Sequence, residues 1–279
     1  MSLNSSSGII NFKDKIIIIT GGASGIGKHL AQKFAKCGAR VVIADLSLEK
    51  ASSVAKPLNG VGFLCDVTKE EQIQNLIRNV KKIFGTVDIF VSNAGICLGE
   101  GAHSASASNE IWNSSWEVNV MAHVYAARAT LPEMIKNQRG QFVQIISAAA
   151  LLSQIGDAAY SATKHAAMGF AESLAITHKS DGINVSVLCP QYVATSMLGY
   201  EEDRGDPRTE IMSAAQLAEI AVPEIQKKKF LILPHPEVRQ FMNFKNKSYD
   251  KWIYEMHKLR ARVLKKSGTL DIKTLHKFV

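Results

Sequence analysis

The stretch Lys15–Gly27, KIIIITGGASGIG, is the part of the sequence that most strongly predicts the fold of this chain. Its four consecutive isoleucines predict a strand that is buried on both faces, as strands of parallel sheets are. The turn Thr20–Gly27 has glycines spaced GxxxGxG and opens a helix predicted near Gly25–Cys37. Residues without a Cβ let the backbone approach a pyrophosphate, and the helix N-terminus offers unpaired N–H groups to its oxygens. A plain tight turn is the alternative, and the flanking strand and helix make it the weaker one.

Outward from this stretch, short β-branched runs alternate with longer amphipathic stretches, which is typical of βαβ units and a parallel sheet. The predicted strands are Lys15–Thr20, Arg40–Ala44, Gly62–Cys65, Val87–Val91, Gln141–Ile146, Asn184–Leu188 and Lys229–Leu233. The predicted helices are Gly25–Cys37, Ser47–Ala55, Lys69–Phe84, Asn109–Asn137 and Ala158–His178, followed by a less regular region at Gln191–Gln226. Right-handed crossovers give the strand order 3-2-1-4-5-6-7. We therefore expect a Rossmann-type doubly wound α/β domain over residues 8–235, with helices on both faces of the sheet.

The net charge of +8 is confined to one end of the chain. Residues 224–279 carry 14 Lys and Arg against 5 Asp and Glu, whereas residues 1–223 carry 19 against 20. A basic surface over the whole protein is not supported, so we expect no nucleic-acid partner.

Other sequence features set the expected class and location. Apolar runs stay below the roughly 18–20 residues that span a bilayer, and Met1–Gly8 lacks the regions of a secretory signal. The four cysteines show no CxxC spacing, so we expect reduced thiols in a cytoplasmic protein. The eight histidines show no HxxxH or HExxH pattern, so we expect no metal site.

Asp45 ends the second predicted strand, 18 residues after Gly27. In such a fold this position faces the adenine ribose, where a carboxylate accepts hydrogen bonds from the hydroxyls and would repel a 2′-phosphate. Leu46 follows Asp45, and Ser24 in the turn is neutral, so no cation is expected to hold a phosphate. We therefore expect NAD rather than NADP. A role of Asp45 as helix N-cap is compatible with this one.

Two further segments are expected to border the cofactor. Asp66 could accept from the adenine amino group beside the Val67 backbone, or it could cap the helix Lys69–Phe84. Asn93, Ala94 and Gly95 end the fourth strand and bring the chain close to the ribose.

Tyr160 and Lys164 are four residues apart at the start of a predicted helix, so their side chains share one face. A nearby ammonium and a positive nicotinamide ring would lower the phenol pKa from about 10 and make Tyr160 a usable acid/base. Ser147 ends the fifth strand, where its hydroxyl can bind the substrate oxygen. Asn119 is a polar residue in a stretch fit for burial, and a satisfied buried amide is its alternative role.

Together, Thr20–Gly27, Asn93–Gly95, Asn119, Ser147 and Tyr160–Lys164 resemble the compact single-domain short-chain dehydrogenases/reductases, over roughly residues 10–235. The resemblance implies that hydride passes between nicotinamide C4 and the substrate carbon. It implies that Tyr160 donates or accepts the proton, Ser147 positions the substrate oxygen, Lys164 binds the nicotinamide ribose and Asn119 holds a water in a proton relay.

The resemblance also implies which residues bind each molecule. The expected cofactor-binding residues are Gly21, Ser24, Gly25, Ile26, Gly27, Asp45, Leu46, Asp66, Val67, Asn93, Ala94, Gly95, Tyr160, Lys164, Pro190, Val193 and Thr195. The expected substrate-binding residues are Ser147, Tyr160, Gln191 and Tyr192. The sequence departs from the family pattern at Ser92, usually Asn, and at Gln191, where glycine usually follows proline. Because of Gln191, the family pattern does not predict the shape of the substrate pocket.

The favoured function is an NAD-dependent secondary-alcohol dehydrogenase or ketone reductase. A catalytically weak NAD(H)-binding redox sensor on the same fold is the alternative, and an epimerase or dehydratase is disfavoured by the chain length. Apolar residues at Ala148–Leu152, Met197, Leu198 and Tyr200 suggest a small-molecule, apolar alcohol or ketone as substrate. Apolar helices at Trp112–Ile135 and Ala158–His178 suggest a homo-oligomer, a dimer or tetramer.

Residues 236–279 are expected to form a basic helical extension. Trp252, Met256, Leu259 and Val263 recur at intervals of 4, 3 and 4, which is one stripe of a helix. Such a helix can lie on an anionic membrane, but we favour docking on the same domain or on a neighbouring subunit. Docking would bring it near Gln191–Gln226 and over the substrate pocket.

Overall fold

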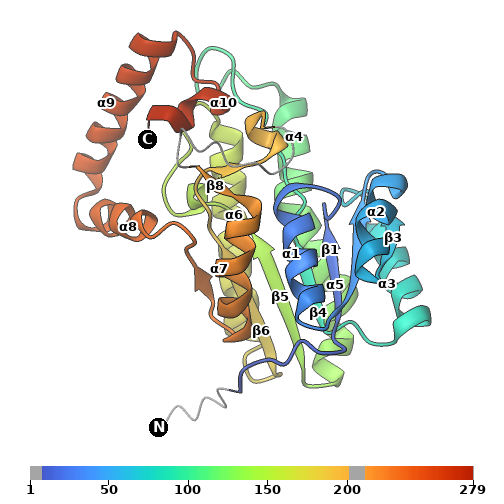
Figure 1. Ribbon diagram of the computed structural model, residues 1–279. Helices are drawn as coiled ribbons and strands as arrows, with labels where there is room; N and C mark the ends of the chain where they lie inside the picture. Colours follow the sequence, from blue (N-terminus) through green and yellow to red (C-terminus); the bar gives the residue numbers. More distant parts are fainter. Residues whose placement is uncertain (1–7, 201–210, 279) are drawn as a thin grey trace, which may run out of the picture.

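The computed structural model describes residues 8–200 and 211–278. In this part of the chain, a parallel seven-stranded sheet has the order β3-β2-β1-β4-β5-β6-β9 (Figure 1). Its strands are β1 (Ile16–Thr20), β2 (Arg40–Asp45), β3 (Val61–Leu64), β4 (Ile89–Ser92), β5 (Gly140–Ile145), β6 (Ile183–Leu188) and β9 (Leu231–Ile232). The predicted order is confirmed. A separate pair, β7 (Val193–Ala194) and β8 (Met212–Ser213), precedes the seventh strand of the large sheet.

Helices cover both faces of the sheet (Figure 1). They are α1 (Gly25–Lys36), α2 (Leu48–Ala55), α3 (Glu70–Phe84), α4 (Asn109–Trp116), α5 (Ala122–Lys136), α6 (Ala158–Thr177) and α7 (Ala214–Gln226). Successive side chains of a strand point to opposite faces, so β1 supplies both cores. Ile17 and Ile19 pack with residues of α1, α2 and α7, whereas Ile16 and Ile18 pack with residues of α3, α5 and α6. This arrangement confirms the doubly wound α/β fold.

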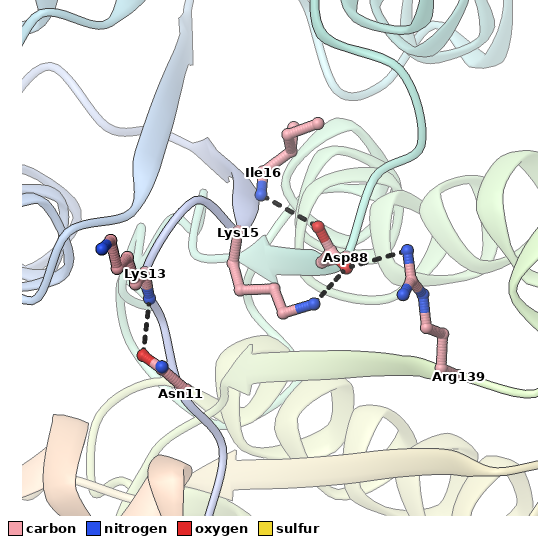
Figure 2. A network of polar contacts seen from close by, with 6 residues as sticks. All are labelled: Asn11, Lys13, Lys15, Ile16, Asp88 and Arg139. Atoms are coloured by element: carbon pink, nitrogen blue, oxygen red, sulfur yellow. Dashed lines mark hydrogen bonds and ion pairs between the residues drawn. The ribbon is translucent and has the colours of Figure 1, made fainter.

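Asp88 links the amino ends of the central strands (Figure 2). Its carboxylate accepts hydrogen bonds from Lys15 Nζ at 3.0 Å and from the Ile16 amide at 3.1 Å. Arg139 Nη2 lies 3.8 Å from the same carboxylate, just before β5. One side chain thus links the starts of β1, β4 and β5.

Two predicted segments need correction. The helix expected over Asn109–Asn137 is interrupted by a π-helical turn, Glu117–Met121, which widens the helix around Asn119. The last third of Gln191–Gln226, a range expected to be less regular, is the helix α7 (Ala214–Gln226). Ser213 and Gln216 form a capping box at its start, and Leu217 and Ala221 are buried beside α1. Residues 201–210 of this region lie outside the described residues.

Beyond β9, the chain forms α8 (Glu237–Lys247), α9 (Tyr249–Ser267) and α10 (Ile272–Leu275). In Figure 1 α8 and α9 lie beside the layered body, and α10 returns toward the carboxyl ends of the strands. Trp252 and Val263 of the predicted stripe are buried, and Met256 and Leu259 are partly buried. Among the described helices, none combines the length and apolar character needed to cross a membrane.

Candidate active site

A cavity of about 1590 Å³ opens at the carboxyl ends of the strands. The turns after β1, β2, β3, β4, β5 and β6 all contribute to its wall, and so does the C-terminal region. Ligands of open α/β sheets bind at this edge, where the crossover connections diverge. The volume exceeds the roughly 300–1,000 Å³ of a single small-molecule site, so the cavity has room for two ligands.

Most of the residues expected at the cofactor lie on this wall. They are Gly21, Ser24, Gly25, Ile26, Asp45, Leu46, Asp66, Val67, Asn93, Ala94, Gly95, Tyr160, Lys164, Pro190, Val193 and Thr195. Gly27 does not line the cavity. A Cβ added to it would lie 2.5 Å from Asn93 Nδ2 and from the Gly21 carbonyl oxygen, so this glycine permits close packing of α1 behind the turn.

The turn between β1 and α1 fits an anionic ligand. Gly21 and Gly25 have φ values of +59° and +49°, which favour glycine, and both line the cavity. Ser24 is the N-cap residue of α1, yet within the described residues its side chain makes no capping hydrogen bond. The first N–H groups of α1 can therefore bind phosphate oxygens.

Asn93 supports the turn between β1 and α1 through hydrogen bonds. Its Nδ2 donates to the Thr20 carbonyl oxygen at 3.0 Å and to that of Gly21 at 2.9 Å. Its own amide donates to Thr20 Oγ1 at 3.1 Å. The Asn93 side chain therefore stabilises the turn between β1 and α1, and it also lines the cavity.

Asp45 and Asp66 lie at the end of the cavity where adenosine is expected. Asp45 Oδ2 accepts from the Ala23 amide at 3.0 Å, and α2 is capped by Ser47 instead, so the helix-cap alternative for Asp45 is wrong. Asp66 Oδ1 accepts from the amide and hydroxyl of Thr68 at 2.9 and 2.8 Å, an Asx turn ahead of α3 rather than its cap. Lys69 also lines the cavity, a cation that the sequence reasoning missed.

Tyr160, Lys164 and Ser147 meet at the other end of the cavity. Asp157 caps α6, with Oδ1 accepting from the Tyr160 amide at 2.8 Å. Lys164, one turn later, is buried with Nζ 5.3 Å from the centre of the Tyr160 ring. Ser147 follows β5 and hydrogen-bonds Tyr160, so the two hydroxyls are adjacent.

Burial dominates the electrostatics of this pair. It raises the pKa of Tyr160, and the hydrogen bond with Ser147 acts in the opposite direction. Burial also lowers the pKa of Lys164 to about 8. Burial is thus the largest influence on the phenol pKa, and the expectation that Lys164 and a nicotinamide ring together lower this pKa stays a prediction.

Asn119 lies behind the cavity wall and is fully buried. Its Oδ1 accepts from the Ile96 amide at 3.0 Å, and its Nδ2 donates to the Ile96 carbonyl oxygen at 3.0 Å and to Thr163 Oγ1 at 3.2 Å. A Cβ on Gly95 would lie 3.4 Å from both Asn119 Oδ1 and Lys164 Nζ. The side chain is therefore a satisfied buried amide that holds the loop after β4 against Lys164.

Two site-shaping residues were not identified from the sequence. Asp157 Oδ2 accepts from the amides of Leu98 and Gly99 at 3.0 and 2.7 Å, which joins the loop after β4 to α6. Its position three residues before Tyr160 is the usual N-cap spacing and could have indicated it. His235 Nδ1 accepts from the Gln191 amide at 3.2 Å, and Nε2 lies 3.1 Å from the Tyr192 carbonyl oxygen. It fixes both expected substrate residues, which line the cavity.

Comparison with known proteins gives one consistent result. The family model for short chain dehydrogenases matches residues 15–205. Epidermal retinol dehydrogenase 2 of Homo sapiens is 35% identical over 67% of this chain and 63% of its own length. The 1-deoxy-11-beta-hydroxypentalenate dehydrogenase of Streptomyces exfoliatus is 30% identical over 82% of this chain and 86% of its own length.

Solved structures agree with the sequence matches. A short-chain dehydrogenase/reductase from Burkholderia phymatum in complex with NAD superposes with a TM-score of 0.79 at 25% identity, over 86% of this chain and 96% of its own. The fold described above is thus shared with proteins of this kind.

Proposed function

Because the chain belongs to the short-chain dehydrogenase family, we propose that it interconverts a secondary alcohol and a ketone with NAD, using Tyr160 as general acid/base. The observation that carries the proposal is the meeting of Ser147, Tyr160 and Lys164 at one end of a cavity with a phosphate-binding turn at the other. NAD⁺, when bound, would accept the hydride from the alcohol, and NADH would supply it to the ketone.

Ser147, Tyr160 and Lys164 each have a role in the proposed reaction. The adjacent hydroxyls of Ser147 and Tyr160 can both hydrogen-bond one substrate oxygen, which fixes the reacting carbon. Since burial raises the pKa of Tyr160, its phenol holds a proton at neutral pH and can donate it to the oxygen as a ketone is reduced. In the reverse direction Tyr160 accepts the proton, and a charged Lys164 stabilises the phenolate and binds the nicotinamide ribose.

The finer features of the proposal rest on single residues. Asp45 in the cavity wall supports NAD over NADP, because a carboxylate repels a 2′-phosphate. Lys69 also lines the cavity, and its positive charge would instead favour the 2′-phosphate of NADP. The protein is proposed to act in the cytoplasm on a small-molecule substrate, an apolar alcohol or ketone.

Replacing Tyr160 with Phe tests the mechanism. Proton transfer by a positioned group contributes about 10²–10⁴-fold, so turnover of secondary alcohols with NAD⁺ should fall at least a hundredfold. NADH formation, followed by absorbance, measures it. Tyr254→Phe, at an exposed tyrosine of α9, is the matched control and should keep full activity. A Tyr160→Phe enzyme that binds NADH and keeps a tenth of its activity would contradict the mechanism.

A further inference from the structure

The part of the cavity beyond Tyr160 is walled by the C-terminal extension, defined here as residues 237–278. This segment lies outside the region that matches the family model, residues 15–205. Its apolar contributions come from all three of its helices and include Phe241, Phe244, Trp252, Met256, Leu259 and Leu275. The shared dinucleotide fold therefore does not account for this wall.

Lys245 anchors the near end of the extension. It is 7% exposed, and its Nζ donates to the carbonyl oxygens of Leu151 at 2.9 Å and Leu152 at 3.1 Å. The ammonium also lies 4.8 Å from the centre of the Trp252 ring and 5.4 Å from that of Tyr249. A buried cation needs such partners, and aromatic faces add attraction. Lys245 thus ties α8 and α9 to the loop that follows Ser147.

The far end of the extension is held by three other contacts. The Tyr200 hydroxyl lies 2.8 Å from His276 Nε2, and the His276 ring lies 5.9 Å from the ring of Tyr192. Leu270 packs on Gly156, where an added Cβ would lie 2.7 Å from the Leu270 carbonyl oxygen. The extension therefore bridges the loop after Ser147 and the loop after Pro190, which flank the reacting centre.

The body contributes an apolar surface to the same cavity. The residues that share this character are Leu98, Val118, Leu152, Ile155, Met197 and Leu198. The charged side chains that the extension places in the wall are Glu255 and Arg262, both exposed residues, and Glu255 is 3.2 Å from Lys258 Nζ. An apolar ligand therefore fits between the extension and the body.

We propose that residues 237–278 form a distal subsite for the hydrocarbon part of a long-chain or bulky secondary alcohol or ketone, and that Lys245 positions this subsite beside the catalytic centre. The inference rests on the proposed function for its reaction and adds the substrate class. Each methylene group that enters the subsite should raise kcat/KM by about threefold to fourfold, until the subsite is full.

A series of methyl ketones from butanone to dodecanone, reduced with NADH, tests the subsite. We expect kcat/KM to rise by about 10³-fold or more along the series. Leu259→Trp fills the subsite and should lower kcat/KM for dodecanone by more than about tenfold, with butanone changed less than about twofold. Ile253→Trp, on the exposed side of the same helix, is the matched control and should change neither value.

Lys245→Met removes the charge and keeps the length of the side chain. Its kcat/KM for dodecanone should fall about tenfold through KM, with butanone nearly unchanged, because the catalytic residues are untouched. A flat chain-length series in the wild-type enzyme, or a dodecanone-to-butanone ratio that neither Leu259→Trp nor Lys245→Met changes, would overturn the proposal.

An equilibrium measurement separates this inference from the reaction. Trp252 lines the cavity, so dodecanone added without NADH should shift the protein's tryptophan emission, and the shift should be lost in Trp252→Phe. If the shift occurs but no ketone in the series is reduced, the proposed function fails and the subsite stands. If butanone is reduced through Tyr160 but dodecanone neither binds nor reacts better, the subsite fails alone.

Discussion

A buried histidine near Lys164 makes the stability of this protein sensitive to acid. His123 is 1% exposed at the start of α5, and neither of its ring nitrogens has a hydrogen-bond partner within the described residues. Burial, and then the charge of Lys164, lowers its pKa from 6.5 to about 3. The folded protein therefore keeps this ring neutral, whereas the unfolded chain protonates it below pH 6.5.

The size of the effect follows from proton linkage. The stabilisation is complete above pH 6.5 and is lost as the pH falls toward 3, because there the unfolded state binds more protons. Between pH 7 and pH 5 the loss at this one site is about 2 kcal/mol, since each pKa unit corresponds to about 1.4 kcal/mol. His123→Leu removes the titrating group and keeps an apolar side chain of similar size. The variant should therefore gain about 2 kcal/mol relative to the wild type at pH 5, compared with pH 7.

Urea unfolding followed by tryptophan fluorescence at both pH values measures the difference. His257→Leu, at an exposed position of α9, is the matched control, and its free energy of unfolding should follow that of the wild type at both pH values. If the difference between His123→Leu and the wild type is the same at pH 5 and pH 7 within about 0.5 kcal/mol, the ring of His123 is charged in the folded protein and the argument from burial is refuted.

Three further outcomes are expected. Asp45→Ala should narrow the ratio of kcat/KM for NAD to that for NADP, whereas a wild-type preference for NADP of about tenfold or more, with Lys69 binding the 2′-phosphate, would contradict the assignment of Asp45. Lys164 has its pKa lowered to about 8 from 10.5, so the unfolded chain keeps that proton longer and stability should rise with pH through this window. Relative to Lys164→Met, urea unfolding should show a gain of about 1 kcal/mol from pH 7 to pH 9, and a constant difference would disprove this. Light scattering at micromolar concentration should give the mass of a dimer or tetramer, because Trp116 and Ile176 are 44% and 79% exposed on α4 and α6, and a monomer mass would rule it out.

The layered fold could be predicted from the sequence, and so could the edge of the sheet at which the cavity opens. A run of isoleucines, a glycine turn and a helix are local features, and their periodicity directly reflects which side chains face the core. The strand order followed because crossovers between parallel strands are right-handed. The spacing of four residues likewise predicted that Tyr160 and Lys164 share one helix face, and in the structure both lie in the first turns of α6.

The contacts and the burial of the polar groups depend on the tertiary structure. Asn119 is a buried amide in both descriptions, but only the folded chain shows that it binds Ile96 and Thr163. Likewise, the direction of the Tyr160 pKa depends on burial, which a spacing of residues does not reveal.

The C-terminal extension is the part of the chain whose packing could least be predicted from the sequence. Its amphipathic stripe was visible in the sequence, but the surface on which the stripe packs was not. An amphipathic pattern indicates only that one face of a helix is buried, and it does not indicate against which residues. Lys245 lies 94 residues from Leu151, whose carbonyl oxygen it binds, and on the sequence alone it was one of many basic residues in the tail. Such a contact depends on where the sheet and loops place two distant segments, and that placement is a property of the packed chain.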